Sequence, residues 1–124
     1  MKITCGTDII EIDRIKQSIE DLGDKFLKRV YTDREIEYCE GKNMQRYQHY
    51  AARFAAKEAA FKALSQYLND SYSIEWKDIE VENSKSGRPK LKINKISMQN
   101  IESMDISISH CKKYAVATVT VLTK

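Results

Sequence analysis

The sequence contains few of the residues that interrupt or lock a backbone. Its 124 residues include one proline, four glycines and three cysteines. This low Pro and Gly content, with 42% hydrophobic residues, excludes a disordered or low-complexity chain. The length fits one domain over residues 1–124 with a modest core. We therefore expect a single globular domain, which self-association would stabilise further.

The cysteines lack the pattern of a disulfide framework or a zinc site. Cys5, Cys39 and Cys111 are odd in number, far apart and without paired ligand spacing. The N-terminal segment MKITCGTDIIEIDRI reaches acidic residues before any long apolar run, so we expect neither a signal peptide nor a membrane span. Reduced thiols without a targeting segment predict a cytoplasmic protein.

The sequence also lacks several familiar functional signatures. There is no glycine-rich phosphate loop, no GxGxxG and no organised nucleophilic triad. The net charge of +3 favours anionic partners without requiring a nucleic acid. The chemistry must therefore be sought in scattered acidic and basic residues.

Hydrophobic periodicity predicts an initial strand, a helical first half and a strand-rich second half. We expect strands over 3–12, 73–82, 91–97, 105–110 and 114–122, and helices over 12–22, 25–32, 33–41 and 44–68. The 25–32 segment is helical or turn-like, and 83–90 is a hairpin loop. The fold class is therefore α+β, with helices packed on a small, mainly antiparallel sheet.

Three local signals refine this prediction. Gly6 inside the first strand indicates a bulge or a close backbone approach. Gly23 is a plausible helix C-cap, and Thr32 with Glu35 forms the pattern of a capping box.

The segment RFAAKEAAFKAL, Arg53 to Leu64, combines small, aromatic and charged residues on one predicted helix. Its alanines form one arc, which we expect to be buried: Ala55, Ala56, Ala59 and Ala63. Phe54 and Phe61 fall together, with Arg53 and Lys57 on one side of them and Glu58 and Lys62 on the other. We expect this mixed face to point away from the core. It could hold a nucleotide, or it could be an ordinary solvated face with an i,i+4 ion pair.

Two acidic residues lie among apolar or small neighbours, Asp8 and Glu58. Two carboxylates plus oxygens of a phosphorylated substrate would suit magnesium, although Asp8 could equally pair with a basic residue. His110 ends an alternating segment with the parity of Ile106 and Ile108, so it is either a packed strand-end residue or a phosphate contact. Ser109 shares the opposite face with Ser107.

Five segments occur together in the order found in one enzyme family: GTDIIEIDRI, YTDREIEYC, RFAAKEAAFKAL, SGRPKL and SISHCKKYAVATV. With these motifs, the chain resembles the holo-acyl-carrier-protein synthases, short 4'-phosphopantetheinyl transferases, from end to end. The resemblance implies their fold and a role in fatty acid biosynthesis. It also implies transfer of 4'-phosphopantetheine from coenzyme A to a serine of apo-acyl carrier protein, with release of adenosine 3',5'-bisphosphate.

The resemblance also implies roles for individual residues. Asp8 and Glu58 correspond to the magnesium ligands, and Lys62 to a phosphate contact. The implied coenzyme A site includes Arg53, Lys62, Ser109, His110, Arg88 and Pro89, the last two within the Gly87-Arg88-Pro89 loop. Our own leading candidate to accept the serine proton is Glu58, directly or through a metal-bound water.

Further implications concern partners. Arg14 matches a position that contacts the acidic carrier protein, and nearby cations could extend that surface: Lys16, Lys25, Lys28 and Arg29. The family is typically homotrimeric with active sites between subunits, which implies that one subunit alone is inactive. The resemblance implies neither nucleic-acid nor membrane partners, and Asp13, Cys39 and Cys111 are left as structural residues.

The chain departs from the usual family pattern at three positions. Thr7 replaces an aliphatic residue, Ala52 replaces a common glycine, and Phe61 lies one position later than usual. We therefore expect the packing around the nucleotide to differ from the usual family pattern. We expect the reaction to be the same, because Glu58 and Lys62 keep their separation. The competing hypotheses are a module that binds nucleotides or RNA without needing Asp8 or Glu58, and a scaffold without activity.

Overall fold

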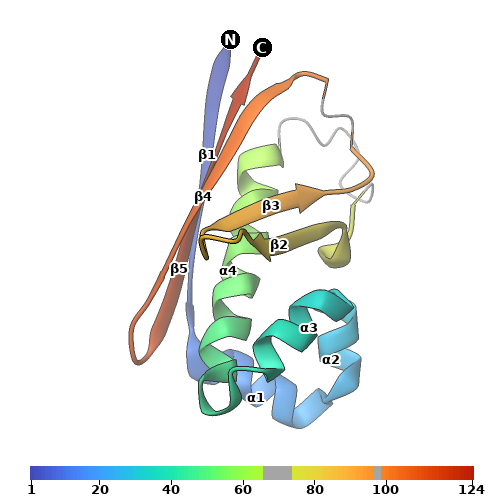
Figure 1. Ribbon diagram of the computed structural model, residues 1–124, viewed down its shortest axis with the longest axis vertical. Helices are drawn as coiled ribbons and strands as arrows, with labels where there is room; N and C mark the ends of the chain where they lie inside the picture. The colour runs from blue at the N-terminus through green and yellow to red at the C-terminus, as the bar shows by residue number, and fades with distance from the viewer. Residues whose placement is uncertain (66–73, 97–98) are drawn as a thin grey trace.

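A computed structural model describes residues 1–65, 74–96 and 99–124. The elements in chain order are β1 Lys2–Glu11, α1 Ile12–Leu22, α2 Asp24–Val30, α3 Asp33–Glu40, η1 Asn43–Gln45, α4 Arg46–Leu64, η3 Trp76–Asp78, β2 Ile79–Asn83, β3 Pro89–Ile93, β4 Ile101–His110 and β5 Tyr114–Thr123. Figure 1 shows the helices and the β2–β3 hairpin on one side of the longer strands. The predicted α+β class is confirmed.

The strands form two separate antiparallel sheets. The larger sheet has the order β1-β5-β4, so the C-terminal strand lies between the other two. Its register pairs Asp8 with Ala117 and Ala117 with Ile108. The smaller sheet is the β2–β3 hairpin, which contacts both α4 and β4 on the same side of the larger sheet (Figure 1).

Most predicted element boundaries agree with the structure within a few residues, but one segment differs in type. Trp76–Asp78 forms a short 3-10 helix instead of strand, because Glu75 and Asp78 make reciprocal capping hydrogen bonds there. Helix α4 begins at Arg46, and the predicted extension to Leu68 lies outside the described residues, as do the predicted strand ends Ser73 and Ser97.

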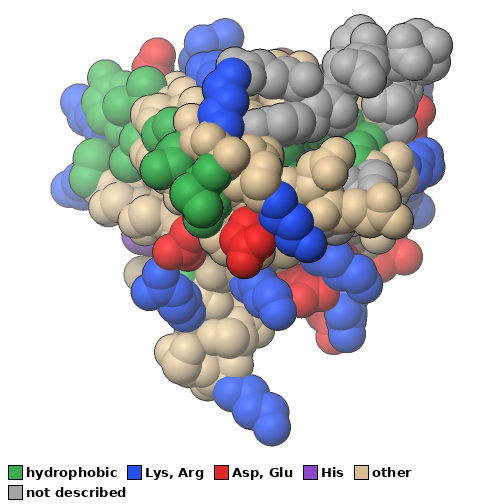
Figure 2. Space-filling model, turned by 90° about the horizontal axis from the view of Figure 1, so that it is seen from above, with side chains coloured by type: hydrophobic (Ala, Val, Ile, Leu, Met, Phe, Trp, Pro, Cys, Tyr) green, Lys and Arg blue, Asp and Glu red, His purple; other side chains and the backbone are tan. Residues whose placement is uncertain are grey.

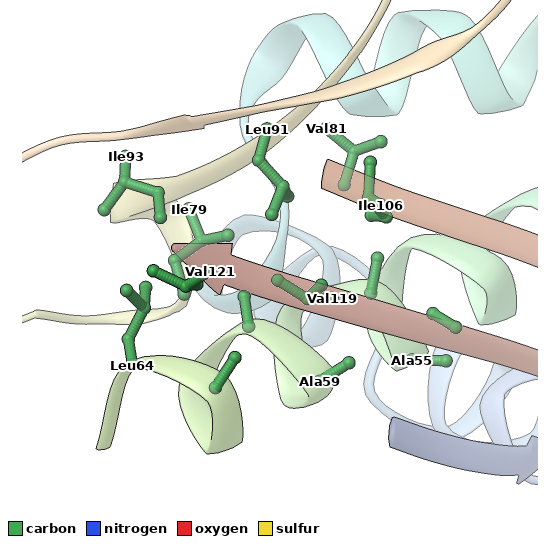
Figure 3. Close-up of a cluster of buried hydrophobic side chains, with 14 of the residues drawn as sticks. Ala55, Ala59, Leu64, Ile79, Val81, Leu91, Ile93, Ile106, Val119 and Val121 are labelled. Carbon is green, nitrogen blue, oxygen red and sulfur yellow. The ribbon is translucent and has the colours of Figure 1, made fainter. Parts of the chain in front are cut away.

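The main core forms where α4 and the β2–β3 hairpin pack against the larger sheet. Its alanine face is buried as predicted, and Ala55 and Ala59 contribute to a cluster with branched residues of both sheets (Figure 3). Those residues include Ile79, Val81, Leu91, Ile93, Ile106, Val119 and Val121. Small residues on the helix allow the strands to approach its backbone closely. A second cluster packs α1, α2 and α3 against the first turns of α4.

Gly6 makes the closest approach between β1 and α4. A Cβ atom there would overlap the carbonyl oxygen of Ala59 and come within 2.7 Å of the backbone nitrogen of Ala63. The predicted close approach is thus confirmed, and β1 pairs with β5 in an unbroken register without a bulge. The contact holds the following residues of β1, including Asp8, against the side of α4.

The other local signals are also confirmed. Gly23 has a φ of 56° and its N–H donates to the carbonyl of Ile19 at the end of α1. Thr32 and Glu35 make both hydrogen bonds of a capping box at the start of α3.

The prediction that all charged residues of RFAAKEAAFKAL face outward is wrong for Arg53 and Lys57, which are buried. Lys57 Nζ lies 2.6 Å from Glu35 Oε1 and also donates to the carbonyls of Val30 and Trp76. The other oxygen of Glu35 accepts the backbone N–H of Val81. Burial lowers the pKa of Lys57, and the Glu35 carboxylate opposes that shift. This pair joins α2, α3, η3 and β2 to α4.

The outer face of the larger sheet carries exposed apolar side chains. Ile3 and Ile9 of β1 are 72% and 64% exposed, and the register aligns them with Leu122 and Val116 of β5. No described helix covers this face (Figure 1). Figure 2 looks onto the end where both termini lie and shows hydrophobic side chains gathered on one side. Such a patch is typical of an interaction surface.

Candidate active site

One flank of α4 brings together three of the predicted site residues. Asp8 of β1 points to the α4 side of the sheet, where its Oδ1 lies 3.4 Å from Lys62 Nζ. Lys62 Nζ also donates to the carbonyl of Thr7 at 2.9 Å. Glu58 lies one helical turn before Lys62 and is half-buried. Asp8, Glu58 and Lys62 therefore form one cluster, which we call the acidic site.

The pKa of Glu58 reflects the presence of the Asp8 carboxylate nearby. Burial raises the pKa of Glu58, the Asp8 carboxylate raises it further, and the Lys62 ammonium partly opposes both. One exposed lysine thus serves two carboxylates. Lys62 therefore neutralises only part of the negative charge of the two carboxylates in the acidic site.

A divalent cation would neutralise the remaining negative charge. The described residues contain no group of three or more His, Cys, Asp or Glu side chains arranged to hold a metal. As a pair of carboxylates, Asp8 and Glu58 would suit a hard cation that takes only one or two protein carboxylates and completes its shell with water and substrate oxygens. Magnesium has this requirement, whereas structural zinc takes four protein ligands.

The opposite flank of α4 holds Arg53 in a different setting. Arg53 and Glu58 are about 140° apart around the helix. The Arg53 guanidinium lies over the ring of Tyr38, 4.1 Å from its centroid, and Nη2 donates to Asn83 Oδ1 at 2.6 Å. Its buried Nε has no hydrogen-bond partner in the described structure. Arg53, Tyr38 and Asn83 line a cavity of about 300 Å³, together with Arg34 and Glu82.

His110 belongs to this second flank. It lies on the α4 side of β4, and the order β1-β5-β4 puts it at the sheet edge opposite Asp8. The His110 ring is 6.0 Å from that of His49, which is 5.6 Å from Tyr38. In the described residues, the predicted coenzyme A contacts therefore lie on two flanks of α4. Lys62 is on the flank of the acidic site, and Arg53 and His110 are on the second flank.

The remaining nucleotide candidates lie beside the sheet. Ser109 points to its outer face, as its alternation with His110 predicts. Arg88 pairs with Asp105 at 3.2 Å. A hydrogen bond from the Ile106 backbone N–H, and then Arg88, lower the pKa of Asp105. Arg88 and Pro89 line a cavity of about 430 Å³ between β3 and β4. Gly87 turns the chain into this edge with a φ of 85°.

The predicted docking residue lies on the first helix after β1. Arg14 is exposed on α1, and the last turn of α2 adds the exposed cations Lys28 and Arg29. Lys16 is also on α1 but lies over the Tyr47 ring. The basic side chains thus cover a surface formed by consecutive helices.

The aromatic stripe on α4 packs against other aromatic rings of the chain. Phe54 stacks on Trp76 with 4.9 Å between centroids, and Phe61 meets the same indole edge-on at 5.5 Å. Phe26 of α2 stacks on the other side of Phe54. The stripe that suggested a nucleotide surface therefore carries structural contacts between α2, α4 and η3.

Comparison with known proteins identifies the family. Residues 4–119 match the profile of the 4'-phosphopantetheinyl transferase superfamily. The chain belongs to this superfamily. The holo-[acyl-carrier-protein] synthase of Ruminiclostridium cellulolyticum is 42% identical over 122 residues, covering 94% of this chain and 90% of that protein. That of Protochlamydia amoebophila is 44% identical over 119 residues, covering 94% and 95%. The chain is thus a member of the holo-acyl-carrier-protein synthase family, and the predicted enzyme class is confirmed.

Solved structures of the synthase family agree. The Helicobacter pylori enzyme in complex with coenzyme A superposes with a TM-score of 0.82 at 33% identity, covering 95% of this chain and 99% of that chain. The Bacillus anthracis enzyme, in complex with coenzyme A (3',5'-ADP), gives 0.76 at 34% identity, covering 98% and 96%. In the parts of this synthase family member that the structure describes, no helix is long and apolar enough to cross a membrane.

Sequence reasoning missed four residues around these flanks: Glu35, Tyr38, His49 and Asn83. Glu35 was read only as part of a capping box, and nothing local links it to Lys57, 22 residues away. Asn83 and Tyr38 reach Arg53 only through the tertiary fold. The one available signal was the i,i+4 spacing of His49 and Arg53, which places both on one side of a helix.

Proposed function

We propose that this protein transfers 4'-phosphopantetheine from coenzyme A to a serine of apo-acyl carrier protein and releases adenosine 3',5'-bisphosphate, with a requirement for magnesium. The observation that carries the proposal is the acidic site: two mutually destabilising carboxylates with one shared lysine, in a chain of this family. Phosphoryl transfer depends chiefly on positioning and neutralising phosphate charge, which these residues are placed to do.

In the proposed reaction, the serine oxygen forms a bond to the phosphorus of phosphopantetheine while the bridging P–O bond to the nucleotide breaks. Asp8 and Glu58 would hold the magnesium, which neutralises charge on the pyrophosphate when bound. Lys62 reaches the acidic site from an exposed position, so its ammonium can turn from Asp8 to a phosphate oxygen. The departing nucleotide phosphate carries away the electron pair of the broken bond.

We assign the proton of the serine hydroxyl to Glu58. Glu58 is a half-buried carboxylate in the acidic site, beside Asp8 and Lys62, where the reacting serine and phosphate would meet. Its position on the rigid helix α4 keeps it fixed relative to Lys62.

The nucleotide end of coenzyme A is assigned to the second flank and the β3–β4 edge, with Arg53, Ser109, His110, Arg88 and Pro89 as contacts. Arg53 supports this assignment because its buried Nε lacks a partner beside a cavity. The acidic carrier protein is assigned to the surface of α1 and α2 around Arg14, where exposed cations would speed its association.

We infer that the protein acts as a homotrimer with active sites between subunits, in the cytoplasm. Two observations support the assembly. The outer sheet face exposes Ile3 and Ile9, and one subunit separates Asp8 from His110 on opposite edges of the sheet. A neighbouring copy would bring the second flank of one subunit to the acidic site of another and cover the apolar face.

The test of the function is intact-mass spectrometry of an apo-acyl carrier protein after incubation with this protein, coenzyme A and magnesium. We expect a gain of one phosphopantetheine that EDTA abolishes and excess magnesium restores. No gain with several carriers and folded protein would reject the proposal. Binding to RNA that survives loss of Asp8 and Glu58 would favour a binding module instead.

The assembly has a separate test. Ile9→Glu places a charge on the outer sheet face, so we expect light scattering to report single subunits without transferase activity. Leu22→Glu is the matched control, because Leu22 is 55% exposed but lies at the end of α1. An Ile9→Glu protein that remains trimeric would show that another surface mediates assembly.

A further inference from the structure

The second flank contains a row of rings that connects three elements. Tyr38 of α3 contacts His49 of α4, and His49 contacts His110 of β4, each in an edge-to-face arrangement. Ring centroids are 5.6 Å and 6.0 Å apart, within the range in which such pairs are favourable. His49 is half-buried in the middle of the row, whereas His110 is exposed at its end.

The charged groups around His49 all disfavour a charge on its ring. Lys42 follows α3 and lies over the other side of Tyr38, Arg53 is one turn further along α4, and His110 faces it from β4. Burial is the largest effect, and with these three groups it lowers the pKa of His49 to about 4. His49 is therefore a neutral ring at physiological pH. His110 is the member of the pair that is open to an anionic ligand.

We propose that His49 is a positioning residue for coenzyme A binding, whose ring packs edge-on against His110 and holds that side chain in the orientation that contacts the nucleotide phosphate. The inference rests on the proposed placement of coenzyme A at His110. An exposed imidazole at a strand end samples several rotamers, and fixing one of them lowers the entropy cost of the contact. A neutral His49 ring can hold the His110 side chain in one rotamer without placing a positive charge next to it.

The proposal predicts a specific pattern of kinetic change. Removing the ring in His49→Ala should raise the KM for coenzyme A by about two- to tenfold, the range that one edge-to-face contact supports. The kcat should stay within about twofold, because His49 touches no reacting atom. His49→Phe keeps a ring that is never charged, so it should restore the wild-type KM. Gln48→Ala is the matched control: Gln48 is a half-buried neighbour on α4 and should leave both parameters unchanged.

A second measurement uses the small number of histidines. The chain has two, so their Cε1–H signals in an NMR spectrum are assigned by comparison with His49→Phe. Because the proposal places the phosphate on His110, adenosine 3',5'-bisphosphate should move the His110 signal, and His49→Ala should need a higher nucleotide concentration than the wild-type protein for the same change.

The outcomes separate this inference from the proposed function. A normal KM for coenzyme A in His49→Ala, or a KM in His49→Phe as high as in His49→Ala, overturns the inference while transfer itself continues. An equal nucleotide concentration for the His110 change in the wild-type and His49→Ala proteins also overturns it. Absence of transfer and of nucleotide binding in the wild-type protein instead rejects the proposed function. A lowered melting temperature with KM and kcat both changed identifies a purely structural role.

Discussion

Helix α4 carries two lysine–carboxylate pairs that are five residues apart and differ in almost every respect. Lys57 and Glu35 are fully buried, with 2.6 Å between nitrogen and oxygen. Lys62 and Asp8 are 54% and 20% exposed, with 3.4 Å between them. The first lysine has three oxygen partners from different elements, whereas the second shares an exposed cluster with another carboxylate. Hydrogen-bond satisfaction thus separates a structural pair from the pair that we propose to be catalytic on the same helix.

The two pairs differ in how completely their charges and hydrogen-bond donors are satisfied. The buried pair has matched charges and fully used donors, so any ligand would have to displace a protein contact. The acidic site has two carboxylates, one exposed ammonium and access to solvent, so the proposed cation would stabilise it. The comparison predicts that changes at the first pair alter unfolding and changes at the second alter turnover.

The largest expected effect is at the acidic site. Asp8→Ala and Glu58→Ala should each reduce turnover by about a thousandfold, because each removes one of two protein ligands for the proposed cation. Circular dichroism and thermal unfolding should remain close to wild type. Normal transfer in both variants would reject the metal assignment.

The buried pair should respond in the opposite way. Lys57→Met leaves the Glu35 carboxylate buried without its partner, so we expect the free energy of unfolding to fall by about 3–5 kcal/mol. Urea denaturation measures this change. Lys62→Met is the matched control, and loss of its exposed pair should cost less than about 1 kcal/mol. Equal losses in the two variants would contradict the distinction.

Gly6 tests whether the approach of β1 to α4 maintains the acidic site. Gly6→Ala should lower stability by about 1–3 kcal/mol, because the new methyl overlaps the backbone of α4 and not a movable side chain. We also expect weaker magnesium dependence, since Asp8 lies two residues further along β1. Wild-type stability would mean that the two elements separate without cost.

Arg14 tests a cation outside both pairs. Arg14→Glu should raise the KM for acyl carrier protein by about tenfold and increase its salt sensitivity, because an exposed charge reversal repels an acidic partner. The KM for coenzyme A should not change. If neither KM changes, Arg14 has no part in docking.

The smallest expected effect concerns pH and the second flank. The pKa of His49 in the folded protein, about 4, lies below its ordinary value of 6.5, so the unfolded chain binds more protons between these values. Stability should therefore fall as the pH decreases from 6.5 to 4, by about 1 kcal/mol for a half-buried group. Unfolding curves of His49→Phe should lack this contribution.

The sequence predicted features that depend on local chemistry. The capping box at Thr32 and the C-cap at Gly23 were predictable because their partners lie within four residues. The alanine face of α4 was predictable from the helical period, and Gly6 from its place inside a strand. Asp8 and Glu58 stood out because acidic residues among small and apolar neighbours are unusual.

Other features depended on contacts between distant segments. Lys57 was misassigned to an outward face because its partner Glu35 belongs to another helix, and helical spacing does not identify buried charge pairs. The stacking of Phe54 on Trp76 likewise joins α4 to a short helix predicted as strand. The division of the coenzyme A residues between two flanks follows from the strand order, which the sequence pattern does not specify.

The pairing of β1 with β5 also affects how the protein is made. Thr7 and Thr118 share a hydrogen bond although 111 residues separate them. During synthesis, β1 leaves the ribosome early but has no partner strand until β5 follows, since β5 lies between β1 and β4. A nascent chain can therefore form its helices before it can position Asp8 beside them. Transferase activity should accordingly appear only after the sheet has closed, and not on a partly synthesised chain.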